Sequence, residues 1–210
     1  MLVAGAKGHA LEILDILLQQ FEAGDIVFFD NVSSSFTLAT INRFSIISTS
    51  EEVQQLFKKD NRFVLGTGNP VIRKKMAEHL TGLGGVLTSV VSGNAVISKL
   101  NVQLGAGLNI MHNVTIQPEV IIGNGTLINA GALIHHEVVI GNYCEICPGA
   151  IVTGNVKIGD NTFVGSGCII LPGLTIGNNV KIGAGAVVLK NIAAGITVAG
   201  NPARQIEKLQ

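Results

Sequence analysis

Residues 121–158 read IIGNGTLINAGALIHHEVVIGNYCEICPGAIVTGNVKI, and this stretch decides the fold of the chain. An aliphatic residue occupies every sixth position within it. The same period extends outward on both sides, from Leu104 to Val188, in fifteen positions without an exception. A small or medium-sized residue stands two positions before each of them. A second, longer period appears as an aliphatic–glycine pair in every third hexad, at Leu104-Gly105, Ile122-Gly123, Ile140-Gly141, Ile158-Gly159 and Ile176-Gly177.

A period of six matches neither an α-helix, with about 3.6 residues per turn, nor a single β-strand, whose side chains alternate. It is typical of a parallel β-helix of hexapeptide repeats, in which short strands and corners form a triangular coil. We expect each aliphatic residue to point inward and to stack on its counterpart in the next coil. Known coils of this hexapeptide type are left-handed, although the period itself does not specify the hand.

Glycine, asparagine and aspartate residues are expected to supply the corner conformations of this coil, because other residues adopt them only with strain. These residues are Gly123, Asn124, Gly125, Gly141, Asn142, Gly159, Asp160, Asn161, Gly177, Asn178 and Asn179.

The composition excludes several classes of partner. The 14 basic and 14 acidic residues balance, and charged residues make up 13% of the 210-residue chain. A basic face for nucleic acid or an anionic membrane is therefore not expected. Polar residues and glycine interrupt every apolar run, so we expect no transmembrane segment and no signal peptide. The expected location is the cytoplasm.

The first part of the chain has a different pattern from the hexads. Residues 1–4 predict a strand, residues 9–21 an amphipathic helix and residues 26–29 a second strand, which is a βαβ opening. Further elements are expected at 45–47 (strand), 50–59 (helix capped by Ser50), 62–65 (strand) and 70–80 (helix). We therefore expect a small Rossmann-like parallel sheet in residues 1–85. Residues 86–210 would form the β-helix and a C-terminal capping tail.

Three cysteines, an odd number, argue against a disulfide framework. The Cys144-x-x-Cys147 pair allows a zinc or redox interpretation. However, Cys144 and Cys168 fall on the positions of small residues in the hexads, and the sequence offers no second Cys or His pair at ligand spacing. Core packing is therefore the preferred interpretation.

The cluster His135-His136-Glu137 is the one dense group of proton-transferring side chains in the hexad region. One interpretation makes a histidine a general base that the carboxylate orients. The alternative is a solvated corner, where polar residues are ordinary. Gly154 follows His136 by three hexads and should lie one coil further along, where its N–H could stabilise an oxyanion. His112 shares the hexad position of His136, but it lies on another face, and a structural or surface role is preferred.

The N-terminal region contains a candidate site for a small polar ligand. Gly5-x-x-Gly8-His9 opens a helix and resembles a phosphate-binding turn, but it lacks the full spacing of a dinucleotide site. Asp30-Asn31 and Gly68-Asn69 follow later strands. Because the carboxyl ends of parallel strands lie at one edge of a sheet, these loops should lie near one another. Glycine at such turns is also often a purely geometric requirement.

The whole chain resembles the hexapeptide-repeat sugar acyltransferases of the sialic-acid O-acetyltransferase and bacillosamine N-acetyltransferase group. In the first part the resemblance rests on Gly5-Ala6-Lys7-Gly8-His9-Ala10, Phe28-Phe29-Asp30-Asn31 and Gly66-Thr67-Gly68-Asn69. In the hexads it rests on Leu127-Ile128-Asn129, His136-Glu137, Pro148-Gly149-Ala150 and Gly154-Asn155-Val156-Lys157-Ile158-Gly159. It closes with Leu171-Pro172 and Gly200-Asn201-Pro202-Ala203-Arg204.

This resemblance implies a role for particular residues. His136 would be the general base and Glu137 its support. The nucleotide-sugar site would be lined by Lys7, Gly8, His9, Asp30, Asn31 and Gly68. Acetyl-CoA would lie between neighbouring coils of a homotrimer, in contact with Glu145, Ser166 and Ala184. Glu145 stands where the family commonly has a second histidine near the thioester.

The function expected from these observations is acetyl-CoA-dependent acetylation of a sugar for a surface polysaccharide or glycan. The acceptor is expected to be a nucleotide-linked amino sugar, and no metal is expected. One alternative is a metal-dependent hydratase of the γ-carbonic-anhydrase type, with His112, His135 and His136 as ligands. A second alternative is a non-catalytic homologue.

Overall fold

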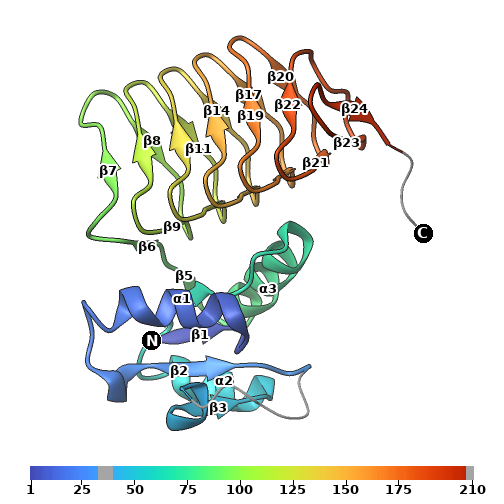
Figure 1. The fold of residues 1–210 in the computed structure, drawn as a ribbon. Coiled ribbons are helices and arrows are strands. Elements are labelled where there is room, and N and C mark those ends of the chain that lie inside the picture. The colour runs from blue at the N-terminus through green and yellow to red at the C-terminus, as the bar shows by residue number, and fades with distance from the viewer. Residues whose placement is uncertain (33–39, 207–210) are drawn as a thin grey trace. The chain divides into compact units, whose positions relative to one another are not determined.

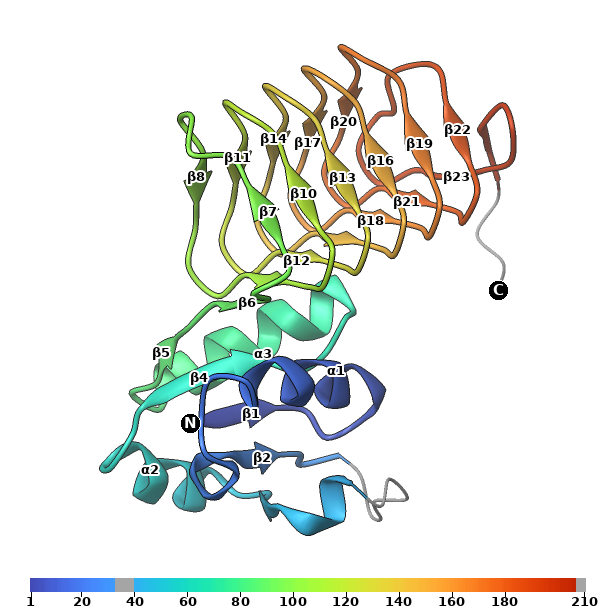
Figure 2. The same ribbon diagram turned by 60° about the vertical axis from the view of Figure 1, so that its left-hand side comes forward.

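The computed structural model describes residues 1–32 and 40–206. Its contacts divide the chain into two compact units, Met1–Val90 and Val91–Gln210. The sequence predicts a polar, irregular segment at residues 32–48, and part of it lies outside the described residues. Figures 1 and 2 show the elements of each unit.

The first unit is an α/β unit built on a five-stranded, wholly parallel sheet in the order β3-β2-β1-β4-β5. Its strands are β1 (Leu2–Ala4), β2 (Val27–Phe29), β3 (Ser45–Ile47), β4 (Arg62–Leu65) and β5 (Val86–Leu87). The central strand β1 pairs with β2 and β4, and all three of its residues are buried. Its carboxyl end, with those of its neighbours, is where a ligand site is expected in such a sheet.

Helices connect these strands. They are α1 (Gly8–Leu17), α2 (Ser50–Phe57) and α3 (Pro70–Gly82), with short 3₁₀ helices η1 (Ala23–Asp25) and η2 (Ile41–Arg43). The prediction that Ser50 caps α2 was wrong. Thr49 is the N-cap and forms a capping box with Glu52, because the side chain of each residue meets the backbone N–H of the other.

The second unit is the left-handed parallel β-helix predicted from the hexads, visible as stacked coils in Figure 1. Its three sheets contain six, five and eight strands. The first sheet holds β7 (Val96–Ile97), β10 (Thr115–Ile116), β13 (Leu133–Ile134), β16 (Ile151–Val152), β19 (Ile169–Ile170) and β22 (Val187–Val188). The second holds β8 (Gln103–Leu104), β11 (Ile121–Ile122), β14 (Val139–Ile140), β17 (Lys157–Ile158) and β20 (Thr175–Ile176).

The third sheet ends in an antiparallel pair near the C-terminus, β23 with β24. It holds β6 (Val90–Val91), β9 (Asn109–Ile110), β12 (Leu127–Ile128), β15 (Glu145–Ile146), β18 (Phe163–Val164), β21 (Lys181–Ile182), β23 (Thr197–Ala199) and β24 (Arg204–Gln205). Consecutive coils pair at an offset of three hexads, as in Ile128 with Ile146. The expected register is therefore confirmed.

The core of the β-helix is the column of hexad aliphatic residues. From Ile110 to Val188 each of them is at most 3% exposed. Leu104 is the exception at 40%, because β8 is the last strand of its sheet and its side chain has a neighbouring coil on one side only. Cys144 and Cys168 are fully buried in the small-residue column, as predicted, and all three cysteines are free thiols.

The corners depend on a left-handed backbone conformation at every sixth residue, from Asn101 to Gly185. The predicted set of corner residues was partly wrong. Gly125, Asn161 and Asn179 have positive φ, but glycines such as Gly123 do not. Gly123 is needed for close stacking instead, since a Cβ there would lie 2.7 Å from the carbonyl carbon of Gly141 in the next coil.

Side chains on one edge of the coil satisfy backbone N–H groups of the coil before. Asn124 Oδ1 accepts from the N–H of Ala106 at 2.8 Å. The same contact is made further along by Asn142, Asp160 and Asn178. The asparagines predicted to bend the chain here therefore act through their side chains. Among the described residues, no helix is both long and apolar enough to cross a membrane.

Candidate active site

His136 and Glu137 occupy the corner between β13 and β14. His136 Nδ1 lies 3.0 Å from Glu137 Oε2. A carboxylate accepts hydrogen bonds, so Nδ1–H donates, and Nε2 is left with its lone pair when the ring is neutral. Both side chains are exposed, at 59% and 61%. The predicted pair is therefore formed, and its free nitrogen is the one that a substrate would meet.

Glu137 holds this position with a backbone that is unusual for its residue type. Its φ is +61°, in the left-handed region that the corners of the coil require. Most corners use glycine or asparagine there, and a glutamate costs about 1 kcal/mol more. The N–H of Glu137 donates to the carbonyl of Pro118 in the preceding coil at 3.1 Å. This contact fixes the backbone from which the carboxylate reaches His136.

Gly154 lies one coil beyond His136, as its spacing predicted. A Cβ at this position would stand 2.6 Å from His136 Cε1 and 2.7 Å from Nε2. No other residue fits under the imidazole without moving it. The N–H of Gly154 has no backbone acceptor in the described part of the chain. A hydrogen-bond donor therefore stands directly beside the imidazole.

His136 and Gly154 line an open hollow of about 520 Å³. Besides His135, His136 and Gly154 it is lined by Thr153, Asn155, Pro172 and Gly173. These last four residues were missed in the sequence, although the period of three hexads places Thr153 beside His135 and Asn155 beside Glu137. The ring of His135 lies edge-on to that of His136, with centroids 6.5 Å apart.

The residues expected to contact a cofactor lie along another edge. Glu145 points outward from β15 and is half-buried, whereas Ser166 and Ala184 are exposed at successive turns. Ser166 and Ala184 share the hexad position of Gly154, and their N–H groups also lack a backbone acceptor among the described residues. Pro118, Pro148 and Pro172 occupy the same hexad position. A proline fits there because the N–H at this point of the turn makes no backbone hydrogen bond, although asparagine and aspartate side chains accept from it in other coils.

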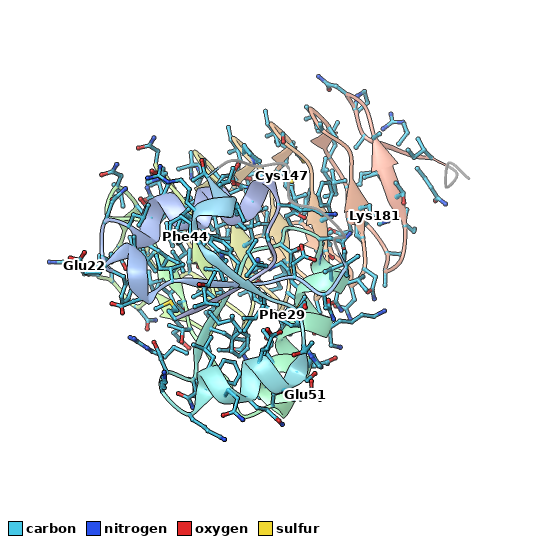
Figure 3. All side chains as sticks on the ribbon, turned by 90° about the horizontal axis from the view of Figure 1, so that it is seen from below. Glu22, Phe29, Phe44, Glu51, Cys147 and Lys181 are labelled. Carbon is cyan, nitrogen blue, oxygen red and sulfur yellow. The ribbon has the colours of Figure 1, made fainter. Side chains whose placement is uncertain are left out.

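Cys147, labelled in Figure 3, lies beside Glu145 and Ser166. Burial, with the nearby Glu145 carboxylate, raises the pKa of its thiol to about 12. The thiol is therefore protonated at neutral pH and is no nucleophile.

The remaining histidine of this unit has a structural contact. Ser92 Oγ lies 2.6 Å from His112 Nδ1, which agrees with the preferred structural role of His112. Within residues 1–32 and 40–206, no three His, Cys, Asp or Glu side chains are arranged to hold a metal ion.

The α/β unit has its own cavity, of about 270 Å³, at the carboxyl ends of β1, β2 and β4. The predicted residues Lys7, His9, Asp30, Asn31 and Gly68 all line it. Gly8 begins helix α1 beside them. The sequence missed an apolar part of the wall, formed by Phe29, Ile72 and Met76, because these residues fall inside the predicted strand 26–29 and the predicted helix 70–80.

Arg73 of α3 is fully buried close to this cavity. Its Nη1 donates to the carbonyl of Thr67 at 2.7 Å, which holds the glycine loop 66–68 against α3. Gly5, with φ +117°, allows the first loop to pass close to Gly66, whose carbonyl oxygen would be 2.9 Å from a Cβ at position 5. The two loops of the cavity are thus packed together.

Comparison with known proteins agrees with both units. Residues 1–80 match the model for the PglD N-terminal domain, and residues 119–154 and 155–190 each match the model for the bacterial transferase hexapeptide. A comparison with curated proteins finds no significant match.

Several solved structures cover nearly the whole chain. The acetyltransferase domain of PglB from Neisseria gonorrhoeae, in complex with acetyl coenzyme A, is 29% identical with a TM-score of 0.87 and 98% coverage of both chains. WeeI from Acinetobacter baumannii is 30% identical with a TM-score of 0.82 and the same coverage. PerB from Caulobacter crescentus, in complex with CoA and GDP-perosamine, is 26% identical with a TM-score of 0.86, over 98% of this chain and 96% of PerB.

The matches of both parts of the chain to domain models, and the nearly full-length similarity to acetyltransferases, identify the chain as an acyltransferase. The chain belongs to the hexapeptide-repeat sugar acyltransferases of the sialic-acid O-acetyltransferase and bacillosamine N-acetyltransferase group.

Proposed function

We propose that the chain transfers an acetyl group from acetyl-CoA to an amine or hydroxyl of a nucleotide-linked sugar, with His136 as the general base. The observation that carries this proposal is the His136–Glu137 hydrogen bond of 3.0 Å, with the opposite ring nitrogen beside Gly154. The complexes of PglB with acetyl-CoA and of PerB with CoA and GDP-perosamine support the two substrate classes.

In the proposed reaction the acceptor nitrogen or oxygen attacks the thioester carbonyl carbon, and His136 Nε2 takes its proton. The carbonyl oxygen becomes an oxyanion, which the N–H of Gly154 stabilises. The C–S bond then breaks as the carbonyl re-forms. The thiolate of CoA leaves and takes the proton from the imidazolium. Glu137 holds the ring and stabilises its positive charge between these two steps.

We assign the binding of the sugar nucleotide to residues 1–85 and the transfer to residues 86–210. Acetyl-CoA would run along the coil edge of Ser166 and Ala184, because amide and phosphate oxygens can accept from N–H groups that have no acceptor in the coil. Glu145 would lie near the thioester. The three free cysteines are compatible with a reducing cytoplasm, where acetyl-CoA is available.

The proposed assembly is a homotrimer. The outward side of the β7–β22 sheet carries a column of aliphatic residues. Its residues are Leu133, Ile151, Ile169 and Val187. The equivalent positions of the β8–β20 sheet are mixed, because Ile121 and Val139 are aliphatic whereas Gln103, Lys157 and Thr175 are polar. Apolar side chains on one face support subunit contact there.

Light scattering tests this assembly, and should give about three times the chain mass of 21.9 kDa. Ile151→Glu should shift the mass to that of the monomer, whereas Lys157→Glu, on the other sheet, should not. A monomeric wild type would contradict the trimer without contradicting the chemistry.

A CoA-release assay against UDP-, GDP- and dTDP-linked amino sugars tests the reaction. One of these acceptors should release CoA, and His136→Ala should lower kcat by at least about a hundredfold. His135→Ala is the matched control and should retain most of the turnover. Full turnover by His136→Ala would show that another group is the base. No CoA release with any acceptor would favour a non-catalytic homologue.

A further inference from the structure

The ring nitrogen Nε2 of His9, in the α/β unit, has an unusual environment. Its Nε2 is buried and has no hydrogen-bond partner, and no other buried side-chain nitrogen or oxygen shares this state in the described part of the chain. His9 lines the cavity at the carboxyl ends of the strands. A buried polar atom without a partner is costly, so its retention requires a reason.

The second ring nitrogen shows which form His9 takes. His9 Nδ1 lies 2.9 Å from Glu12 Oε2, and because the carboxylate accepts, Nδ1 carries the hydrogen. Burial holds the pKa of His9 below its usual range, and the charge of Arg73 acts in the same direction, whereas Glu12 opposes it. Lys7 and Asp30 are the other charged residues on the cavity wall. A neutral ring with hydrogen on Nδ1 makes Nε2 an acceptor.

Next to His9, the start of helix α1 offers hydrogen-bond donors instead of an acceptor. Helix α1 begins at Gly8, and Lys7, its N-cap, makes no capping side-chain hydrogen bond. The first turn contains no acidic residue. The N–H groups of such a turn and the helix dipole favour an anion. The same end of the cavity thus offers donors for an anion and, at His9, an acceptor for a donor.

We propose that His9 Nε2 accepts a hydrogen bond from an O–H or N–H group next to the phosphate of the bound ligand. The cavity would then select a phosphate ester with a neighbouring donor over phosphate or pyrophosphate alone. This inference rests on the proposed function for the ligand class. The donor would come either from the nucleoside or from the sugar. Because Nε2 is covered, binding requires a neighbouring side chain of the cavity wall, such as that of the exposed Lys7, to move aside.

Calorimetric titrations of the full chain test this selection. The probes are UDP, GDP and dTDP, their sugars UDP-glucose, GDP-mannose and dTDP-glucose, and pyrophosphate. The tightest nucleotide probe should bind His9→Phe about tenfold more weakly than wild type, and His9→Gln, whose amide oxygen can accept, should recover part of the loss. Pyrophosphate should bind all three proteins alike. A loss confined to the nucleotide sugars places the donor on the sugar, and an equal loss for the free nucleotide places it on the nucleoside.

The ¹⁵N resonances of the histidine rings give a second readout on the wild type. Nε2 of His9 should have the shift of an unprotonated nitrogen and should move on addition of the tightest probe. A protonated Nε2, or equal binding to wild type and His9→Phe, would overturn the inference. Should His9→Phe fail to fold, the wild-type resonance decides alone. If acetyl transfer proceeds while the sugar KM of His9→Phe is unchanged, the inference fails and the proposed function stands. If no nucleotide probe binds the wild type, both fail.

Discussion

The imidazole of His136 lies against the backbone of Gly154 in the coil that follows. The space for a Cβ at position 154 is already taken, since that atom would stand 2.6 Å from Cε1 of the ring. The position of the proposed base is therefore set by the absence of a side chain in the neighbouring coil as well as by its hydrogen bond to Glu137.

Gly154→Ala should displace the imidazole while the coil remains intact, because φ at this position is not in the left-handed region. A displacement of about 1 Å at the base lowers kcat by about a hundredfold. Steady-state kinetics and thermal unfolding measure the two effects. Gly93→Ala, at a glycine of the same unit with open space around its Cβ position, is the control and should change neither. Normal kcat in Gly154→Ala would contradict this account.

Glu137→Asn should stabilise the fold and abolish most activity. Asparagine tolerates the left-handed conformation that Glu137 adopts at φ +61°. Relief of that strain should raise the free energy of unfolding by up to about 1 kcal/mol. The shorter side chain no longer holds His136 Nδ1, so kcat should fall. Denaturant unfolding and the CoA-release assay would be compared on one preparation, and a destabilised variant would speak against strain.

Thr126→Val should destabilise the β-helix by about 2–4 kcal/mol. Thr126 is fully buried, its hydroxyl donates to the carbonyl of Gly141 at 2.8 Å, and it accepts from the N–H of Cys144 at 3.0 Å. Valine leaves both buried backbone groups without these partners. Thr175→Val, at an exposed outward position, should be nearly neutral. Urea unfolding followed by circular dichroism gives both values, and equal effects would contradict the role of the hydroxyl.

The cysteines should resist alkylation in the folded protein. Burial raises the pKa of Cys144 and of Cys168 to about 12, as for Cys147, so the reactive thiolate is scarce at pH 8. Mass spectrometry after iodoacetamide treatment should show little modification of native protein and three modified sites in denaturant. Rapid labelling of Cys147 in the native state would show that its surroundings open.

Acidification should lower the stability of the α/β unit in the pH range where His9 of the unfolded chain takes up a proton. Its folded pKa lies below the usual histidine value of 6.5, so the unfolded chain binds more protons as the pH falls through that value. Stability should therefore decrease from about pH 6.5 downward, before carboxylates such as Asp60 titrate. His9→Phe should flatten the curve in that interval. If the stability of His9→Phe and that of the wild type fall equally between pH 6.5 and 5, the ring of His9 is not neutral and buried in the folded protein.

The β-helix was predictable in detail because its core repeats. Each inward residue must stack on a similar residue in the next coil. This requirement places an aliphatic residue at every sixth position of the sequence. The same argument placed Gly154 beside His136. The corner conformation of Glu137 was not predictable, since nothing in a glutamate marks a positive φ. It follows from the register that its neighbours impose.

The ligand cavity of the α/β unit was predictable only at its loops. Glycines and polar residues after strands marked Gly5, Asp30 and Gly68, because strand ends meet at one edge of a parallel sheet. The burial of Arg73 and the unpartnered Nε2 of His9 depend on residues from distant parts of the chain, since Arg73 donates to Thr67 and its charge acts on His9. Contacts of that kind leave no local trace in the sequence.

The fixed offset of three hexads between paired strands also limits how the length of this half of the molecule can change. An insertion of one or two residues inside a coil would rotate every later side chain onto the wrong wall of the prism and would expose its core. The gain or loss of a complete coil keeps each wall intact and moves His136 relative to the C-terminal end by one strand spacing, about 4.8 Å. The length of this unit can therefore change only in steps of one complete coil.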